Sequence, residues 1–108
     1  MNSLKDATVV SFNNYIDYAK ESVISKTLIK KKAGTVTLFS FDKGEGLSTH
    51  SASFDALVQV LDGSVEITID KKKYVVNKDE SILLPANIPH GLVAIEKFKM
   101  LLTMIKEK

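Results

Sequence analysis

The sequence contains no cysteine and no arginine, and each absence excludes certain kinds of site. Without cysteine, the chain can form neither disulfides nor thiolate metal sites. All 15 basic residues are lysine, so the bidentate side chain that best recognises carboxylates, phosphates and guanine edges is missing. The net charge of +2 is also too small to indicate a nucleic-acid partner. We therefore expect no nucleic acid among the partners.

Long apolar runs are absent as well. No stretch approaches the ~20 residues that a helix needs to cross a bilayer, and residues 1–10 do not resemble a signal peptide. We therefore expect no membrane association, with the cytoplasm as the default compartment, which the lack of cysteine permits. A chain of 108 residues, with 44% hydrophobic and 26% charged residues, suits a single globular domain over residues 1–108.

Short segments rich in Val, Ile, Thr and Leu, separated by turn signals, fill most of the chain. Such spacing is typical of an all-β sandwich or barrel, and both an immunoglobulin-like sandwich and a jelly roll fit it. A short N-terminal helix is predicted over residues 13–20, capped by Asn13 or Asn14. The predicted strands cover residues 22–30, 35–41, 56–61, 64–70, 74–76, 81–84, 91–95 and 98–106.

Two histidines stand within two spaced patterns, over residues 44–63 and 79–94. These patterns resemble the two signature motifs of the cupin family, Gly-x5-His-x-His-x3/4-Glu-x6-Gly and Gly-x5-Pro-x-Gly-x2-His-x3-Asn. The matching residues are Gly44, His50, Gly63, Pro85 and His90. The resemblance implies a single-domain, cupin-type jelly-roll barrel, also called a double-stranded β-helix. The resemblance therefore favours the jelly roll over the immunoglobulin-like sandwich.

The chain departs from the family pattern at three polar positions. Ala52, Ala56 and Ala94 stand where the family has histidine, glutamate and asparagine. The resemblance therefore implies a reduced metal site that retains only His50 and His90. Asp79 and Asn87 replace turn glycines of the second motif. Asn87 tolerates a left-handed backbone, so we expect its turn to survive.

Strand alternation predicts the side chains around the two histidines. If residues 48–56 stay extended, Asp55 faces the opposite side from His50. The apolar stripe Phe98, Met100, Leu102 and Met104 of the last strand either adds a wall to the pocket or is simply core. The expected pocket is larger and drier than in a cupin with all four ligands. It consists of Ala52, Phe54 and Ala56 beside His50, of Leu92 and Ala94 beside His90, and of Met100.

Three functions fit this expected site. The first is a small-molecule-binding protein, with or without one divalent metal held by His50 and His90. Imidazole suits Zn, Ni, Fe, Mn and Cu, so the metal cannot be identified. The second is a metal-dependent enzyme, such as a dioxygenase or an isomerase of a sugar or small acid. The third is an interaction protein that keeps the barrel without a site. Catalytic zinc normally has three protein ligands, and no third ligand or base can be assigned from the sequence.

The strand edges of a jelly roll need cover, because their backbone groups pair readily with another chain. Small members of the family commonly form dimers. We therefore expect a homodimer, with the strand over residues 22–30 as the candidate that pairs or swaps.

Overall fold

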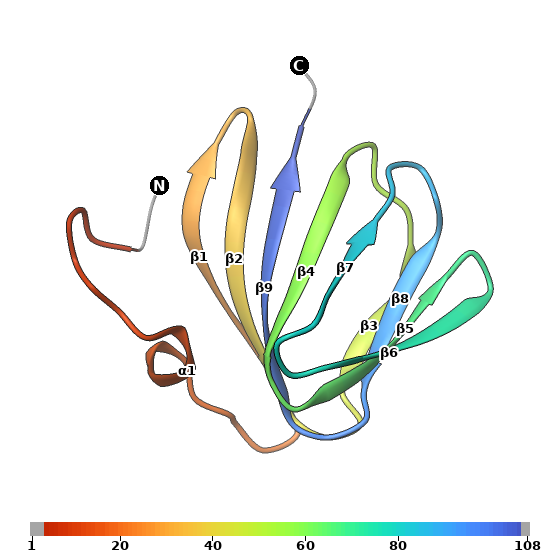
Figure 1. The fold of residues 1–108 in the computed structure, drawn as a ribbon, viewed down its shortest axis with the longest axis horizontal. Helices are drawn as coiled ribbons and strands as arrows, with labels where there is room; N and C mark the ends of the chain where they lie inside the picture. Colours follow the sequence, from red (N-terminus) through yellow and green to blue (C-terminus); the bar gives the residue numbers. More distant parts are fainter. Residues whose placement is uncertain (1–3, 107–108) are drawn as a thin grey trace.

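The computed structural model describes residues 4–106, which fold into one short helix and nine strands (Figure 1). The elements are α1 (Phe12–Tyr15), β1 (Val23–Lys31), β2 (Gly34–Phe41), β3 (Gly46–His50), β4 (Asp55–Asp62), β5 (Ser64–Ile69), β6 (Lys72–Asn77), β7 (Ser81–Leu84), β8 (His90–Ala94) and β9 (Phe98–Ile105). All eight predicted strands are present, with β3 in addition.

The strands form two antiparallel sheets. One sheet has five strands in the order β1-β2-β9-β4-β7, and the other has four in the order β3-β8-β5-β6. The chain passes repeatedly from one sheet to the other, so neighbours in a sheet are mostly far apart in sequence (Figure 1). This arrangement confirms the predicted all-β, cupin-type jelly roll.

The main core lies between the two sheets. The rings of Phe41 and Phe98 stack there, with centroids 4.5 Å apart, and Val58, Ile67 and Met100 are almost fully buried around them. Burial of large apolar side chains at about 25 cal/mol per Å² is the main stabilising contribution in a domain of this size.

A second cluster lies on the outer face of the five-stranded sheet, the side turned away from the other sheet. Ile16, Leu28 and Leu38 are each at most 1% exposed there. The predicted helix over residues 13–20 is too long, because α1 ends at Tyr15 and Ile16 is extended (φ −137°) where it packs on the sheet. The N-cap is Ser11, so the expected caps Asn13 and Asn14 were also wrong.

The condition that residues 48–56 stay extended, on which the predicted face of His50 depended, is not met. β3 ends at His50, and β4 begins at Asp55 in the other sheet. The intervening turn carries the chain across, and its Ala52 carbonyl accepts a hydrogen bond of 2.6 Å from the Asn87 amide. A chain that changes sheets must bend, so strand alternation does not relate His50 to residues 52, 54 and 56.

Four motif positions adopt the left-handed backbone. Gly44 and Gly63 have φ of 84° and 74°, while Asp79 and Asn87 have φ of 70° and 65°. The prediction that the second motif keeps its turns without glycine is therefore confirmed. Within residues 4–106, no helix has the length and apolar character needed to span a membrane.

The two motif glycines offer a matched test of the fold. A Cβ at Gly63 would lie 1.8 Å from the Lys97 carbonyl oxygen, whereas a Cβ at Gly44 would meet nothing within 4 Å. We expect Gly44→Ala to cost about 1–2 kcal/mol through its left-handed backbone. Gly63→Ala should cost roughly 1–3 kcal/mol more, because the backbone must also move. Urea unfolding of both variants measures the difference, and equal losses would contradict this packing.

Candidate functional site

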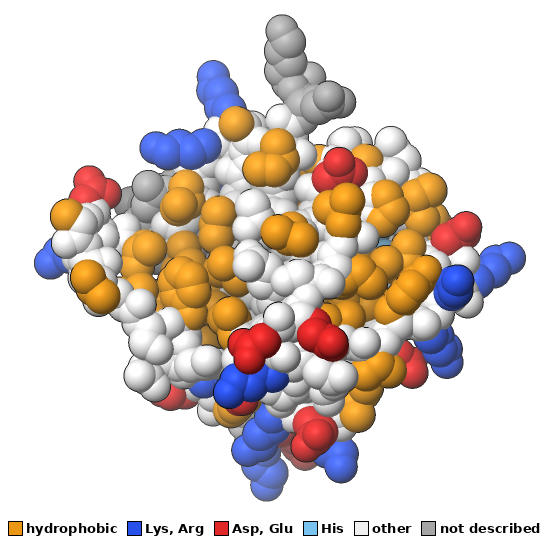
Figure 2. Space-filling view, in the orientation of Figure 1, with side chains coloured by type: hydrophobic (Ala, Val, Ile, Leu, Met, Phe, Trp, Pro, Cys, Tyr) orange, Lys and Arg blue, Asp and Glu red, His pale blue; other side chains and the backbone are white. Residues whose placement is uncertain are grey.

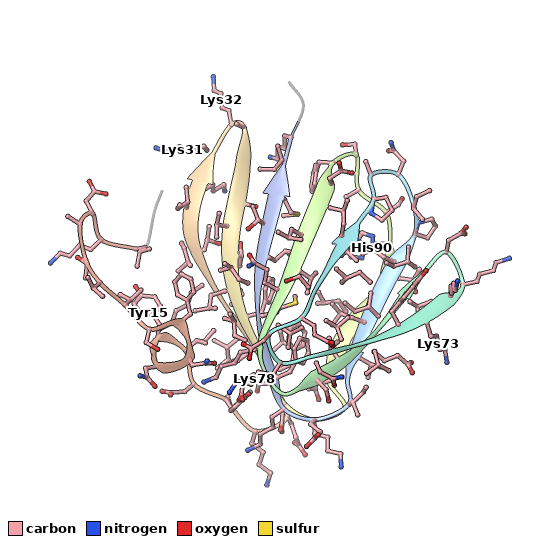
Figure 3. The ribbon with its side chains drawn as sticks, in the orientation of Figure 1. Tyr15, Lys31, Lys32, Lys73, Lys78 and His90 are labelled. Atoms are coloured by element: carbon pink, nitrogen blue, oxygen red, sulfur yellow. The ribbon has the colours of Figure 1, made fainter. Side chains whose placement is uncertain are left out.

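The pairing of β3 with β8 brings the two histidines together. His50 and His90 are direct cross-strand partners, and their ring centroids lie 4.6 Å apart with the planes at 64°. His90 is only 8% exposed, whereas His50 is exposed. Figure 3 shows His90 beside the ends of β7 and β8. The pair thus lies where the space between the sheets meets solvent.

Each imidazole makes the same local hydrogen bond. Nδ1 of His50 lies 2.9 Å from the Ser48 carbonyl oxygen, and Nδ1 of His90 lies 3.2 Å from the Ile88 carbonyl oxygen. A carbonyl oxygen can only accept, so both Nδ1 atoms must carry the proton and donate. In the neutral ring, this leaves the Nε2 lone pair available to a metal or a hydrogen-bond donor.

The environment of His90 favours its neutral form. Burial lowers the pKa of His90 below its usual 6.5, and the nearby His50 lowers it further, while the hydrogen bond to the Ile88 carbonyl opposes both effects. Desolvation disfavours a charged imidazole, so His90 is a neutral base at pH 7. A neutral ring is the form that binds a metal ion.

A cavity of about 50 Å³ lies behind the two rings. Its polar side chains are the two imidazoles alone, and the remaining walls are apolar. The volume is well below the roughly 300–1,000 Å³ of a drug-sized ligand pocket, so it accepts only a few non-hydrogen atoms. The lining residues are Leu47, His50, Ala56, Val58, Leu84, His90, Gly91, Leu92, Met100, Leu102 and Met104.

Three of the expected pocket residues, Ala56, Leu92 and Met100, line this cavity. The other three do not. Ala94 is buried in the core, Phe54 lies under the Lys106 ammonium, 5.9 Å from the ring centroid, and Ala52 belongs to the turn between the sheets.

Several further lining residues were not predicted from the sequence. Val58 follows from Ala56 by strand alternation once β4 is placed. Leu102 and Met104 belong to the predicted stripe of the last strand, which therefore serves as both core and wall. Leu47 and Leu84 come from other strands, and no local pattern placed them beside the histidines.

The donor set limits the metal that could be held. Across the described part of the chain, no three residues among His, Cys, Asp and Glu cluster closely enough to bind a metal ion. Asp55 is exposed, and its Oδ1 accepts a hydrogen bond of 2.8 Å from the Ala86 amide. The residues thus fit a metal held by two imidazole nitrogens, with water or ligand at its other positions. They do not supply the three ligands of catalytic zinc or the carboxylate of the facial iron triad.

The two facing antiparallel sheets, with a histidine pair at their opening, form a jelly roll. The family model described as "Cupin domain" matches residues 37–106, well over half of the chain, and the chain belongs to this family. No curated protein matches the sequence.

Solved structures agree with this assignment. A conserved protein of unknown function from Streptococcus pyogenes is 37% identical, with a TM-score of 0.95, and the match covers 99% of this chain and 94% of that one. A cupin superfamily protein from Desulfitobacterium hafniense is 25% identical, with a TM-score of 0.92 and coverage of 98% and 97%. A cupin 2 conserved barrel domain protein from Leptotrichia buccalis is 44% identical over 87% of this chain and 46% of that one, with a TM-score of 0.84.

The lowered pKa of His90 predicts how stability depends on pH in metal-free protein. The unfolded chain takes up a proton near pH 6.5, before the folded chain does. Stability is therefore fully present above that pH and falls as the pH drops towards the folded-state pKa. We expect His90→Gln to reduce the loss of unfolding free energy between pH 7.5 and 5.5, measured by urea titration. An unchanged loss would contradict the neutral, buried state of His90.

Proposed function

We propose that this cupin binds a small ligand in the cavity between its sheets and holds it through His50 and His90. The observation that supports the proposal best is the hydrogen bond that each ring makes through Nδ1. Each Nδ1 is engaged by a carbonyl two residues earlier, at Ser48 and Ile88. Both Nε2 lone pairs therefore remain to meet a ligand at the only polar part of an apolar cavity.

The chemistry of the site favours a particular class of ligand. An imidazole whose Nδ1 donates to a carbonyl presents, in its neutral form, an acceptor at Nε2, and no lysine lines the cavity. The matching partner is a hydroxyl or N–H donor, or a metal ion, rather than a carboxylate. The apolar walls suit a short hydrocarbon body. Because methionine adapts its shape readily, Met100 and Met104 could move to admit a larger one.

A divalent transition metal is the natural cofactor of such a pair, and Zn, Ni, Fe, Mn and Cu all suit imidazole. His50 and His90 would hold it through Nε2, and the hydrogen bonds at Nδ1 would orient the rings, as outer-shell partners do in many metal sites. When bound, a metal would supply Lewis-acid or oxygen-activating chemistry. With two protein ligands, we expect weaker binding than in a full cage.

The alternative is a metal-dependent cupin enzyme, either a dioxygenase or an isomerase of a sugar or small acid. The Nδ1 hydrogen bonds favour it, since they preorganise both rings for a metal. The cavity lining opposes it, because a metal would occupy both imidazoles, and the lining contains no carboxylate, lysine or tyrosine that could then serve as general acid or base. Ligand binding is therefore the better supported function. A cytoplasmic location stays a prediction.

Metal uptake tests the histidine pair. We expect native, untagged protein to contain metal, or to take up added Zn, Fe or Ni, and the double variant His50→Ala/His90→Ala to lose that capacity. Plasma mass spectrometry and calorimetric titration measure both. The control is Asp55→Asn, which keeps the carbonyl oxygen that accepts from Ala86 but removes the charge. Equal loss in the control would make Asp55 a third ligand, against the present account.

Ligand class can be tested in metal-free protein with two probes of similar size, 2-propanol and acetate. The alcohol donates a hydrogen bond to a neutral imidazole, while acetate only accepts. We expect 2-propanol at millimolar concentrations to shift the amide NMR signals of residues that line the cavity, such as Gly91 and Leu92, and acetate to shift them much less. If acetate binds equally well, or if neither probe binds, the proposed ligand class is wrong.

A further inference from the structure

Two methionines share the cavity with the two histidines. The chain has 3 methionines, and two of them, Met100 and Met104, line the cavity behind His50 and His90. Both belong to β9, on the face that packs into the main core. A thioether sulfur is a soft metal ligand, and an imidazole nitrogen suits several transition metals. The cavity therefore brings two kinds of metal donor together.

Strand pairing places Met104 at the same end of the fold as the histidines. Two loops cross between the sheets there, close to the end of β9 (Figure 1). One loop leads from His50 to β4, and the other leads from β7 to His90. Ala56, the second residue of β4, pairs with Leu84, the last residue of β7, and also with Met104. Met104 thus lies at the level of the two loops that carry the histidines, on the opposite sheet.

Met100 lies deeper between the sheets. It comes four residues before Met104 on the same face of β9, which corresponds to roughly 13 Å along the strand. Its cross-strand partners are Phe39 and Val60, and it is only 1% exposed. Met100 therefore belongs to the floor of the cavity, whereas Met104, which is partly exposed, stands at the open end.

The surroundings of Met104 leave its thioether free to adjust. Ala56, its neighbour on β4, lines the same cavity and carries only a methyl group. Methionine is unbranched and has three rotatable bonds, whereas each imidazole is held by a hydrogen bond at Nδ1. Packed sheets lie about 10 Å apart, so side chains from both must reach inwards to share one ion. A flexible thioether opposite two oriented rings meets this requirement.

We propose that Met104 completes a three-coordinate metal site with His50 and His90, and that this site selects Cu(I). The proposal rests on the proposed binding of metal by the histidine pair, to which it adds a third ligand and the identity of the ion. Soft thioether ligands select Cu(I). Zinc instead takes thiolate, imidazole and carboxylate ligands, so a thioether adds little to its binding.

The charge of the donors favours the same ion. An imidazole that binds a metal is neutral, a thioether is neutral as well, and no carboxylate lines the cavity. In the Born approximation, the cost of desolvating an ion rises with the square of its charge, so a monovalent ion costs about a quarter as much to bury as a divalent ion of the same size. An apolar cavity with neutral donors therefore suits Cu(I) better than a divalent metal.

The molecular surface on this side is largely apolar. In Figure 2, hydrophobic side chains predominate where β9, β4 and β7 lie in Figure 1, and most lysines stand at the rim of the view. No lysine lines the cavity itself. A cation that enters beside the ends of β7 and β8 therefore meets no positive side chain in the cavity.

Leucine substitutions separate the two sulfurs, because leucine has a similar volume and no sulfur. Loss of an outer-shell partner already costs about 10–100-fold in metal affinity, so loss of a ligand in Met104→Leu should weaken Cu(I) binding roughly tenfold or more. Competition with a chromogenic Cu(I) chelator, under anaerobic and reducing conditions, measures this affinity. Zinc binding to the same variant should change little, and the matched control Met100→Leu should leave both affinities unchanged.

Three results of this competition would overturn the proposal. They are wild-type protein that binds zinc but not Cu(I), a Met104→Leu variant that binds Cu(I) as tightly as wild type, and equal weakening by Met100→Leu. Each of them leaves the histidine pair intact as the proposed binding site, so failure of this proposal is distinguishable from failure of the proposed function.

Silver(I), a soft ion that does not change its oxidation state here, shows the ligands directly by NMR. In protein with ¹³C-labelled methionine methyl groups, assigned with the two leucine variants, we expect one equivalent of Ag(I) to shift the Met104 methyl signal and the ring signals of His50 and His90. The Met100 signal should stay in place. Shifts of the histidines without Met104 would overturn the thioether ligand alone. Absence of histidine shifts would contradict metal binding by the pair, and this proposal with it.

Discussion

The antiparallel pairing of β3 with β8 is the constraint on which the site depends. This pairing requires close approach of two backbones, since a Cβ at Gly46 would lie 2.1 Å from the Leu92 carbonyl oxygen. A register shift between Leu47 and His50 then sets His50 directly opposite His90. Without that shift, the two rings would not stand in contact, and the cavity would lose its polar opening.

The remaining features of the site follow from what surrounds that pair. One wall comes from β4, β7 and β9 of the opposite sheet, whose inward side chains also form the main core. Packing and cavity lining are therefore continuous, which explains why the cavity is small and apolar. The alanine at position 56 faces this space where the family places a glutamate, so the chain has exchanged a carboxylate for an apolar surface. That exchange favours binding over acid–base catalysis.

Local patterns predicted the fold well. Strand periodicity located eight strands, and the motif spacing identified the jelly roll, because both signals lie within short stretches of sequence. The left-handed turn at Asn87 also followed from residue type, since asparagine tolerates that conformation. The contact between His50 and His90 could be expected from the family resemblance alone.

The rest of the site depends on how distant strands pair, and local sequence patterns could not predict that pairing. Ala52 and Phe54 were expected beside His50, but the chain changes sheets between residues 50 and 55, so period-two alternation stops there. The helix near Tyr15 is shorter than predicted, and Ile16, which is extended, packs against the sheet almost fully buried. Leu84 reaches the cavity through the pairing of β7 with β4, which no local pattern specifies.

The proposed site requires that both imidazoles line the cavity with the proton on Nδ1, so that Nε2 is available to a ligand. Long-range ¹H–¹⁵N NMR of the histidine side chains, in metal-free protein at neutral pH, tests it most directly, because the chain has 2 histidines and their signals are easily separated. We expect both rings to carry the proton on Nδ1. A proton on Nε2 of either ring would contradict it, because that ring could then neither bind a metal through Nε2 nor accept a hydrogen bond there.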